Sequence, residues 1–267
     1  MKQLKLMVLT LTLLMGTMFT SCMDSGESGP QQWAGVVKVN DRMGYVTFTD
    51  AAGTELIPTN TIPVTLNARM AYIYCQVDEG QDLSTNPKSI KITLLADPTG
   101  IDATAITTPK VGESGDVITN APVGSLSFAS GYSTVAPFQF SENTIVLPVL
   151  YRVKNVTTTE DIKNELAKHT FTLVCYTDDI KSGDTILKLY LRYKVEDEPA
   201  AIAERATRTS SFKAYEISQI LREYTLKSGQ AKPAKITIVA KQNEYNNKLE
   251  DTSTTEKVYE IEYKTAE

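Results

Sequence analysis

The feature that most constrains the fold is a recurring alternation of apolar and polar residues with a period of two. It is clearest at 186–195, where every second position is apolar: Leu187, Leu189, Leu191, Tyr193 and Val195. Successive side chains of a β-strand point to opposite faces, so this pattern predicts a strand with one face in a core. Helical periodicity is confined to short connecting segments. The sequence therefore predicts an all-β protein.

The alternating segments fall into two blocks, and 267 residues suit two domains better than one. The first block is 33–97, in which strands are predicted at 33–39, 45–50, 54–59, 69–77 and 89–95. Five short strands that begin with a hairpin and a meander are typical of a small closed barrel. The sequence therefore predicts an OB-like five-stranded barrel here.

The second block, 125–267, is predicted to form an immunoglobulin-like β-sandwich with short helices only in the connections. Its clearest predicted strands lie at 144–153, 169–177, 186–195, 235–241 and 258–264, and 212–220 is predicted to be a strand that passes into a turn. Between the blocks, 98–124 is rich in Thr, Pro, Gly and Asp and lacks a clear period. That composition predicts a linker or loop.

The beginning of the chain predicts export and a lipid anchor. Lys2 and Lys5 precede an apolar run over 6–19, and small residues then lead to Cys22. This order is typical of a lipoprotein signal peptide at 1–21, with Cys22 as the acylated first residue of the mature chain. The apolar run is shorter than the roughly 20 residues that a membrane span needs. Residues 22–32 are rich in Ser, Gly and Pro, which predicts a flexible tether.

Charge and residue usage narrow the possible functions. Lys and Arg number 27 and Asp and Glu 32, and no basic cluster occurs, which argues against a nucleic-acid partner. His169 is the only histidine, and we interpret it as structural because a triad or a histidine-rich metal site needs further partners. Cys75 and Cys175 lie in apolar segments and are expected to be buried free thiols, with a disulfide as the alternative.

Acidic residues crowd one turn, at Asp178, Asp179 and Asp184. A solvated acidic turn is the simpler interpretation, and weak calcium binding is the alternative, although the spacing differs from that of an EF-hand loop. No phosphate-binding loop and no cysteine pair of zinc-site spacing occur. The sequence thus predicts no catalytic residue, no metal and no cofactor.

Several segments together resemble the NigD-like lipoproteins. These are the Trp-Ala-Gly-Val-Val at 33–37, the aromatic strand and Asp-to-Leu-Ile-Pro segment at 45–58, and the strands at 169–174 and 189–193. The resemblance covers most of the mature chain and implies an OB-like barrel, a β-sandwich and a cell-envelope location. It also implies an accessory or immunity role associated with a bacteriocin operon.

Taken together, these observations predict a non-catalytic binding or accessory module at the outer membrane of a Gram-negative cell. A protein partner is the first expectation, and a surface glycan-binding lipoprotein is the alternative. Four barrel aromatics are candidates for a ligand face, unless they cover the barrel or bury the joint between domains: Trp33, Tyr45, Tyr72 and Tyr74. Thr185 is a candidate O-glycosylation site, because Asp184-Thr185-Ile186 resembles an acceptor triplet of exported proteins in some Gram-negative anaerobes.

Overall fold

The computed structural model describes residues 31–265, except 43, 61–65, 82, 84–86, 114–115 and 131–132. The predicted signal peptide at 1–21, Cys22 and all but the last two residues of the predicted tether lie outside the described residues. The chain divides into two compact units. Unit 1 holds the described residues up to Ala103 together with Ala129–Val135, and unit 2 holds Thr104–Phe128 and the described residues of Ala136–Glu267. None of the helices in the described segments has the length and apolar character of a membrane span.

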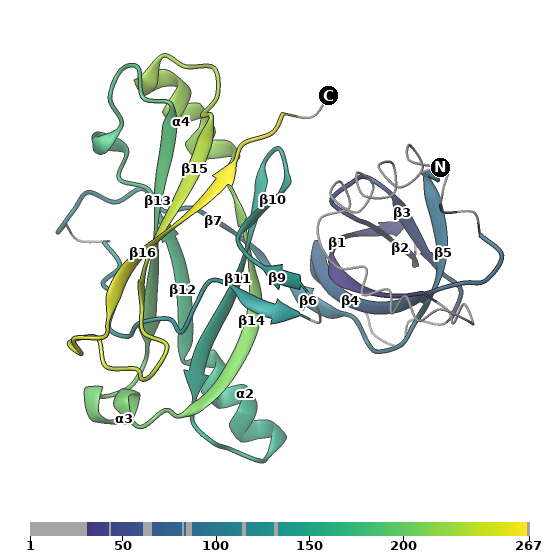
Figure 1. The fold of residues 1–267 in the computed structure, drawn as a ribbon, viewed down its shortest axis with the longest axis horizontal. Coiled ribbons are helices and arrows are strands. Elements are labelled where there is room, and N and C mark those ends of the chain that lie inside the picture. Colours follow the sequence, from purple (N-terminus) through teal and green to yellow (C-terminus); the bar gives the residue numbers. More distant parts are fainter. Residues whose placement is uncertain are drawn as a thin grey trace, which may run out of the picture. The chain divides into compact units, whose positions relative to one another are not determined.

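Unit 1 is a closed barrel. Its strands are β1 (Gln32–Arg42), β2 (Tyr45–Thr49), β3 (Glu55–Pro58), β4 (Met70–Val77) and β5 (Ser89–Leu94). They follow the order β1-β2-β3-β5-β4, and β4 pairs with β1 to close the ring (Figure 1). The β3–β5 pair is parallel and the other pairs are antiparallel. This arrangement confirms the predicted OB-like barrel.

The barrel core follows from strand alternation. On β4, Ala71, Ile73 and Cys75 are buried and point inward, as their spacing predicts. They meet Val37 of β1 and Phe48 of β2 in one apolar cluster. The cluster fixes the strand register, because a slip of one residue would turn its members out to solvent.

Unit 2 contains two sheets that share one core. The first has the order β10 (Phe138–Ser141), β11 (Thr144–Val153), β14 (Thr207–Glu216) and β7 (Ala103–Ala105). The second has the order β12 (His169–Val174), β13 (Ile186–Val195), β15 (Lys235–Gln242) and β16 (Thr255–Glu262). Inward residues of both sheets form one cluster, among them Ile145, Leu147, Leu189, Leu191 and Ile238. The predicted all-β fold with a C-terminal sandwich is confirmed.

The helices of unit 2 lie at the ends of the sandwich. Figure 1 shows α4 (Ser218–Ser228) at one end and α2 (Thr159–Ala167) and α3 (Pro199–Ala203) at the other. The segment 212–220, predicted as a strand that passes into a turn, is a strand up to Glu216 and enters α4 at Ser218 instead of a turn. Ile220 and Tyr224, one helical turn apart, are both buried, and this spacing favours a helix over a strand. Gly229 ends the helix with a positive φ of 74°.

The segment predicted as a linker, 98–124, is instead part of both units. β6 (Thr99–Ile101) pairs with β4 of the barrel, and β7 extends the first sheet of unit 2. Further on, Ala121 and Val123 are buried in the core of unit 2. The side chain of Asn120 exchanges two hydrogen bonds with the backbone of Val195. The sequence does not reveal this placement, because the segment has only isolated apolar residues and no periodic apolar face. Hydrogen bonds with neighbouring strands hold it in the fold.

A hairpin inside the predicted sandwich block belongs almost wholly to unit 1. β8 (Phe128–Ser130) pairs with β9 (Ser133–Val135), and Ala129–Val135 belongs to unit 1 although it lies inside the predicted sandwich block. The chain therefore returns to unit 1 after it has begun unit 2. A sequence pattern cannot show this return, because the contacts that define it are not local.

Candidate functional site

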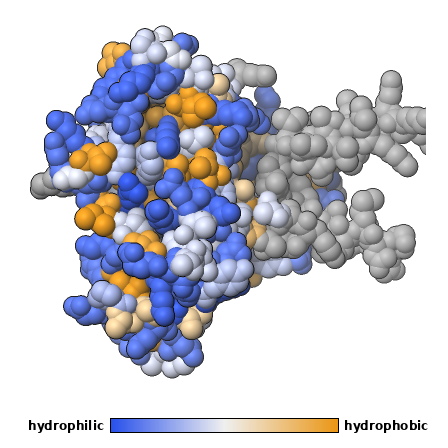
Figure 2. Space-filling model, turned by 60° about the vertical axis from the view of Figure 1, so that its left-hand side comes forward, coloured by the Kyte–Doolittle hydropathy of each residue, from blue (hydrophilic) through white to orange (hydrophobic). Residues whose placement is uncertain are grey.

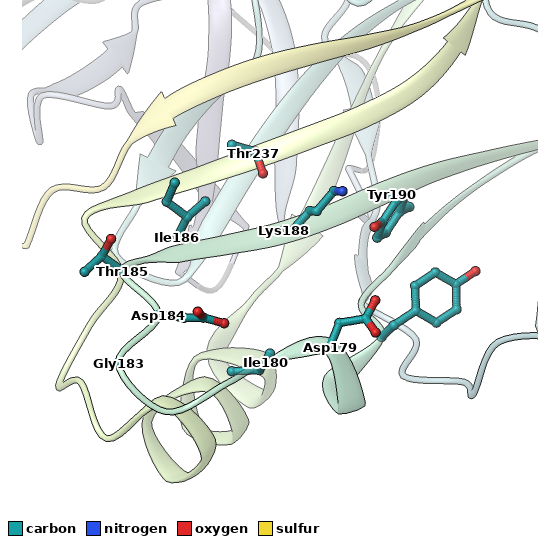
Figure 3. Close-up of a pocket in the computed structure, with 10 residues that line it drawn as sticks. Asp179, Ile180, Gly183, Asp184, Thr185, Ile186, Lys188, Tyr190 and Thr237 are labelled. Atoms are coloured by element: carbon teal, nitrogen blue, oxygen red, sulfur yellow. The ribbon is translucent and has the colours of Figure 1, made fainter.

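An open pocket of about 510 Å³ lies on the solvent-facing side of β13, in unit 2 (Figure 3). Strands β13 and β15 form one wall and the segment 179–185 forms the other. Its lining consists of Tyr176, Asp179, Ile180, Gly183, Asp184, Thr185, Ile186, Lys188, Tyr190 and Thr237. Pockets that bind small ligands have volumes of this order.

Strand alternation supplies the β13 wall. Leu187, Leu189 and Leu191 point into the core, so Ile186, Lys188 and Tyr190 point outward. The parallel pairing of β13 with β15 aligns Lys188 with Thr237 and brings the threonine into the same wall. The register of two sequence-distant strands therefore builds this side of the pocket.

Hydrogen bonds fix the opposite wall. The Lys181 N–H donates to Asp184 Oδ2 at 2.7 Å, and the Gly183 N–H donates to the carbonyl of Ser228 at 2.8 Å. The hydroxyl of Tyr224 donates to the carbonyl of Asp184. Gly183 has a φ of 88°, a backbone conformation that residues with a Cβ atom rarely adopt. The wall is therefore preformed, with α4 as its support.

Several polar groups in the pocket have unused hydrogen-bonding capacity. Within the described part of the chain, the Asp179 carboxylate and the Thr185 and Thr237 hydroxyls make no side-chain hydrogen bond. Lys188 Nζ lies 5.0 Å from the ring centroid of Tyr190, and the Tyr190 hydroxyl raises the pKa of that ammonium. Ile186 contributes an apolar surface and is 48% exposed. The pocket thus offers donors, acceptors and an apolar patch to one ligand.

An aromatic and cationic cluster includes two residues of the pocket lining, Tyr176 and Tyr190. The rings of Tyr176 and Tyr190 are 5.2 Å apart and tilted by 60°. Arg192 donates to the Tyr176 hydroxyl at 2.6 Å, and this hydroxyl donates to Asp116 at 2.8 Å. The Arg192 guanidinium also lies 5.2 Å from the Tyr190 ring centroid, within the range of a cation–π contact. The cluster holds the Tyr190 side of the pocket in place.

The four predicted ligand-face aromatics do not share one face. Trp33 pairs with Cys75 and packs against the barrel core, so it points to the inner side of the sheet. A Cβ on Gly35 would come within 2.6 Å of the Trp33 ring, which shows that the ring lies over that glycine. Tyr72 and Tyr74 belong to the outer side of β4. Strand register therefore places the half-buried Trp33 on the opposite face from Tyr72 and Tyr74, and its ligand role stays a prediction.

The three barrel tyrosines differ in their surroundings. Tyr45 is 57% exposed and pairs with Arg42 across the β1–β2 hairpin. Tyr74 is 39% exposed, and its hydroxyl donates to Gln32 at 2.5 Å. Tyr72 is half-buried, and burial raises its pKa. A ligand role for these tyrosines stays a prediction.

The predicted modification site lies at the pocket. Thr185 is exposed and directly precedes β13, and it contributes to the pocket lining. Its accessibility agrees with the predicted O-glycosylation, which stays a prediction, as does lipid attachment at Cys22. Both other thiols, those of Cys75 and Cys175, are free and buried, and burial raises the pKa of each to about 12. Such thiols are protonated and unreactive at neutral pH.

The acidic turn is partly neutralised. Asp178 pairs with Lys227 at 3.0 Å. No group of three or more His, Cys, Asp or Glu side chains in the described ranges is placed to hold a metal ion. Asp179 and Asp184 instead face the pocket, where their carboxylates can accept hydrogen bonds.

A buried polar network at the α2 end of unit 2 was not anticipated from the sequence. The Glu165 carboxylate accepts hydrogen bonds from Arg205 Nε at 2.7 Å and from the Lys154 N–H at 2.9 Å. The same carboxylate lies 3.3 Å from His169 Nε2. Arg205 also contacts Asp197 at 3.1 Å, although its side chain is fully buried. These groups come from four separate segments, so no local pattern indicates them. The network gives His169 the structural role that the sequence predicts.

Comparison with known proteins places the chain in a family. No family model and no curated protein matches the sequence. A crystal structure of a protein from Bacteroides fragilis NCTC 9343, named "Putative lipoprotein (BF3042)", is 94% identical, with a TM-score of 0.82 over 89% of this chain and 100% of that chain. The protein of unknown function DUF1344 from Bacteroides vulgatus ATCC 8482 is 11% identical, with a TM-score of 0.54 over 87% of this chain and 91% of that chain, and shares the fold alone. Neither name mentions the NigD-like proteins. At 94% identity, the chain belongs to the same family as the Bacteroides fragilis protein.

Proposed function

We propose that this protein is a lipid-anchored, non-catalytic binding module of the NigD-like type, located at the outer membrane of a Gram-negative cell. The leader that ends at Cys22 supports the anchor, and so does the lipoprotein name of its Bacteroides fragilis relative. A chain acylated in this way lies at the membrane surface and does not cross the bilayer.

The single observation that carries the proposal is the preformed pocket on the outer side of β13, where Asp179, Thr185 and Thr237 make no side-chain hydrogen bond within the described chain. Binding sites combine a largely preformed cavity with a few placed polar groups. The histidine and the two described thiols lie outside the pocket. Both ring nitrogens of His169 have partners, and both described thiols are buried.

Two classes of ligand are open to such a module. The NigD-like resemblance implies a protein partner and a bacteriocin-associated immunity role, and the Tyr176, Tyr190 and Arg192 cluster supports it, since Tyr and Arg dominate interface hot spots. A surface glycan is the second class, which the hydroxyl and carboxylate groups of the pocket support.

A crosslinking experiment tests whether this face binds a component of the envelope. A photo-activated amino acid in place of Ile186 reports on the pocket, and the same group in place of Tyr245, which is 75% exposed, is the matched control. We expect an adduct from position 186 that position 245 does not give. Equal labelling at both positions, or steady turnover of a hydrolase substrate by the purified protein, would contradict the proposal.

A further inference from the structure

We infer that the pocket between 179–185 and strands β13 and β15 binds a neutral oligosaccharide. This inference rests on the proposed function of the same face and names its ligand. Three properties of the pocket carry it: the mixture of charges, the unused hydrogen-bonding capacity and the apolar patch beside the polar groups.

The charges around the pocket select against ionic ligands. The carboxylates of Asp179 and Asp184 line one wall and the ammonium of Lys188 lines the other. An anionic ligand would meet two carboxylates, and a cationic ligand would meet the ammonium. A neutral hydroxyl group avoids both costs, because it donates to a carboxylate and accepts from an ammonium. The pocket therefore fits a ligand with several uncharged hydroxyls.

Both walls of the pocket carry polar side chains that are available for hydrogen bonds with a ligand. The Asp179 carboxylate and the Thr237 hydroxyl stand on opposite sides of the pocket, and neither has a side-chain hydrogen bond within the described chain. Thr237 is largely buried, yet it still lines the pocket. A ligand hydroxyl can both donate and accept, so it can bond to the carboxylate and to the threonine hydroxyl.

The apolar part of the pocket suits the C–H face of a sugar ring. Ile180 and Ile186 come from the two walls, and Tyr190 adds an aromatic ring at one end. On the side of the molecule that Figure 2 shows, apolar residues form small groups separated by hydrophilic ones. The apolar surface of the pocket itself is limited to Ile180, Ile186 and the Tyr190 ring, which suits a small amphipathic ligand better than a large protein interface.

The pocket needs little rearrangement to bind. Gly183, Asp184 and Tyr224 hold the 179–185 wall, and regular strands form the other wall. A preformed site avoids the cost of ordering side chains and loops on binding. Its volume of about 510 Å³ and its open side allow a chain of sugars to continue beyond the cavity.

Calorimetric titration of the full chain, purified in a non-glycosidic detergent, tests the inference. The probes are neutral oligosaccharides of glucose, mannose, galactose and N-acetylglucosamine, with uronic-acid oligosaccharides for comparison. We expect saturable binding of a neutral oligosaccharide and weaker binding of the acidic ones. Asp179→Ala and Thr237→Val should each weaken binding about tenfold, the effect of one lost hydrogen bond to a ligand. Tyr245→Ala is the control and should bind like the wild-type chain.

The outcomes separate this inference from the proposed function. If no neutral oligosaccharide binds and the Ile186 crosslinker captures a protein, the ligand class is wrong and the binding function stands. If neither probe gives a signal, both proposals fall. Binding that is unchanged in both pocket variants would place the glycan elsewhere and overturn the inference. Hydrolysis of a bound oligosaccharide would keep the ligand class and overturn the non-catalytic function.

Discussion

The Nδ1 atom of His169 lies 2.6 Å from the hydroxyl oxygen of Tyr193, and both side chains are buried. Nε2 of the same ring lies 3.3 Å from the Glu165 carboxylate. A neutral imidazole that carries its proton on Nε2 satisfies both contacts, because the tyrosine donates to Nδ1 and the ring donates to Glu165. A second ring proton would turn Nδ1 into a donor, so the Tyr193 hydroxyl would have to accept instead of donate. Burial of the ring disfavours that charged form, so the site favours an uncharged histidine.

We predict that acid destabilises unit 2 through His169. Burial lowers the pKa of its imidazole, Arg205 and Lys213 lower it further, and Glu165 opposes the shift. The unfolded chain, with a histidine pKa of about 6.5, then takes up the proton first. The stabilising contribution is therefore complete above about pH 6.5 and is lost as the pH falls towards the folded pKa, by at most about 1.4 kcal/mol per pH unit.

Urea denaturation at a series of pH values measures this slope, with His169→Gln as the variant without a titrating ring. We expect the free energy of unfolding of the variant to depend less on pH between about pH 7 and 5. Glu165 adds a separate loss at lower pH. Burial raises its pKa, but bonds from Lys154, Arg205 and His169 bring the net value below the usual one. Parallel pH profiles for both proteins would contradict the role of His169.

Arg205→Ala should destabilise the protein by about 3–5 kcal/mol, because it leaves the buried Glu165 carboxylate without its cation. Arg222→Ala is the matched control, since Arg222 is exposed on α4 and surface changes cost at most about 0.5 kcal/mol. Chemical denaturation of both variants provides the comparison. Equal stability of the two would mean that the Arg205 pairs contribute nothing.

Leu189→Asp and Leu191→Asp should each unfold unit 2, whereas Lys188→Asp should not. Both leucines are buried in the core, and an unpaired carboxylate there costs several kcal/mol. The Lys188 side chain points to solvent. Circular dichroism and thermal melting distinguish the three variants, and a folded Leu189→Asp protein would refute the register of β13.

Cys22→Ala should release the protein from membranes. The predicted lipid attaches to that thiol, and the acyl chains would hold the protein at the membrane. Detergent partitioning and intact-mass measurement report the loss of lipid. Retention of the variant in the membrane fraction would argue against the lipoprotein assignment.

Thr185 should carry an O-linked glycan in the native host, because it is exposed and lies in the Asp184-Thr185-Ile186 triplet. Intact-mass spectra of the wild-type and Thr185→Val proteins measure it. The wild type should be heavier by the mass of a glycan that the variant lacks. Unmodified wild-type protein from the host would eliminate this site.

Local sequence determined the strands and their faces. Alternation over 186–195 is enough to show which side of β13 lies in the core, because the side-chain period of a strand is two. The same reasoning placed the buried face of β4. It missed α4, because 212–220 was interpreted as a strand that passes into a turn, whereas the buried Ile220 and Tyr224 follow a helical spacing.

The pocket and the polar network were decided by tertiary structure alone. Thr237 joins Lys188 only because β15 pairs in parallel with β13, and that register depends on packing between distant segments. Arg205 could be recognised as buried only once Glu165 and Asp197 were placed around it, since an isolated arginine in a sequence is expected at the surface. The leader and the strand pattern are properties of neighbouring residues, and the sequence alone therefore determined them. Sites made from several segments depend on contacts that only the folded chain creates.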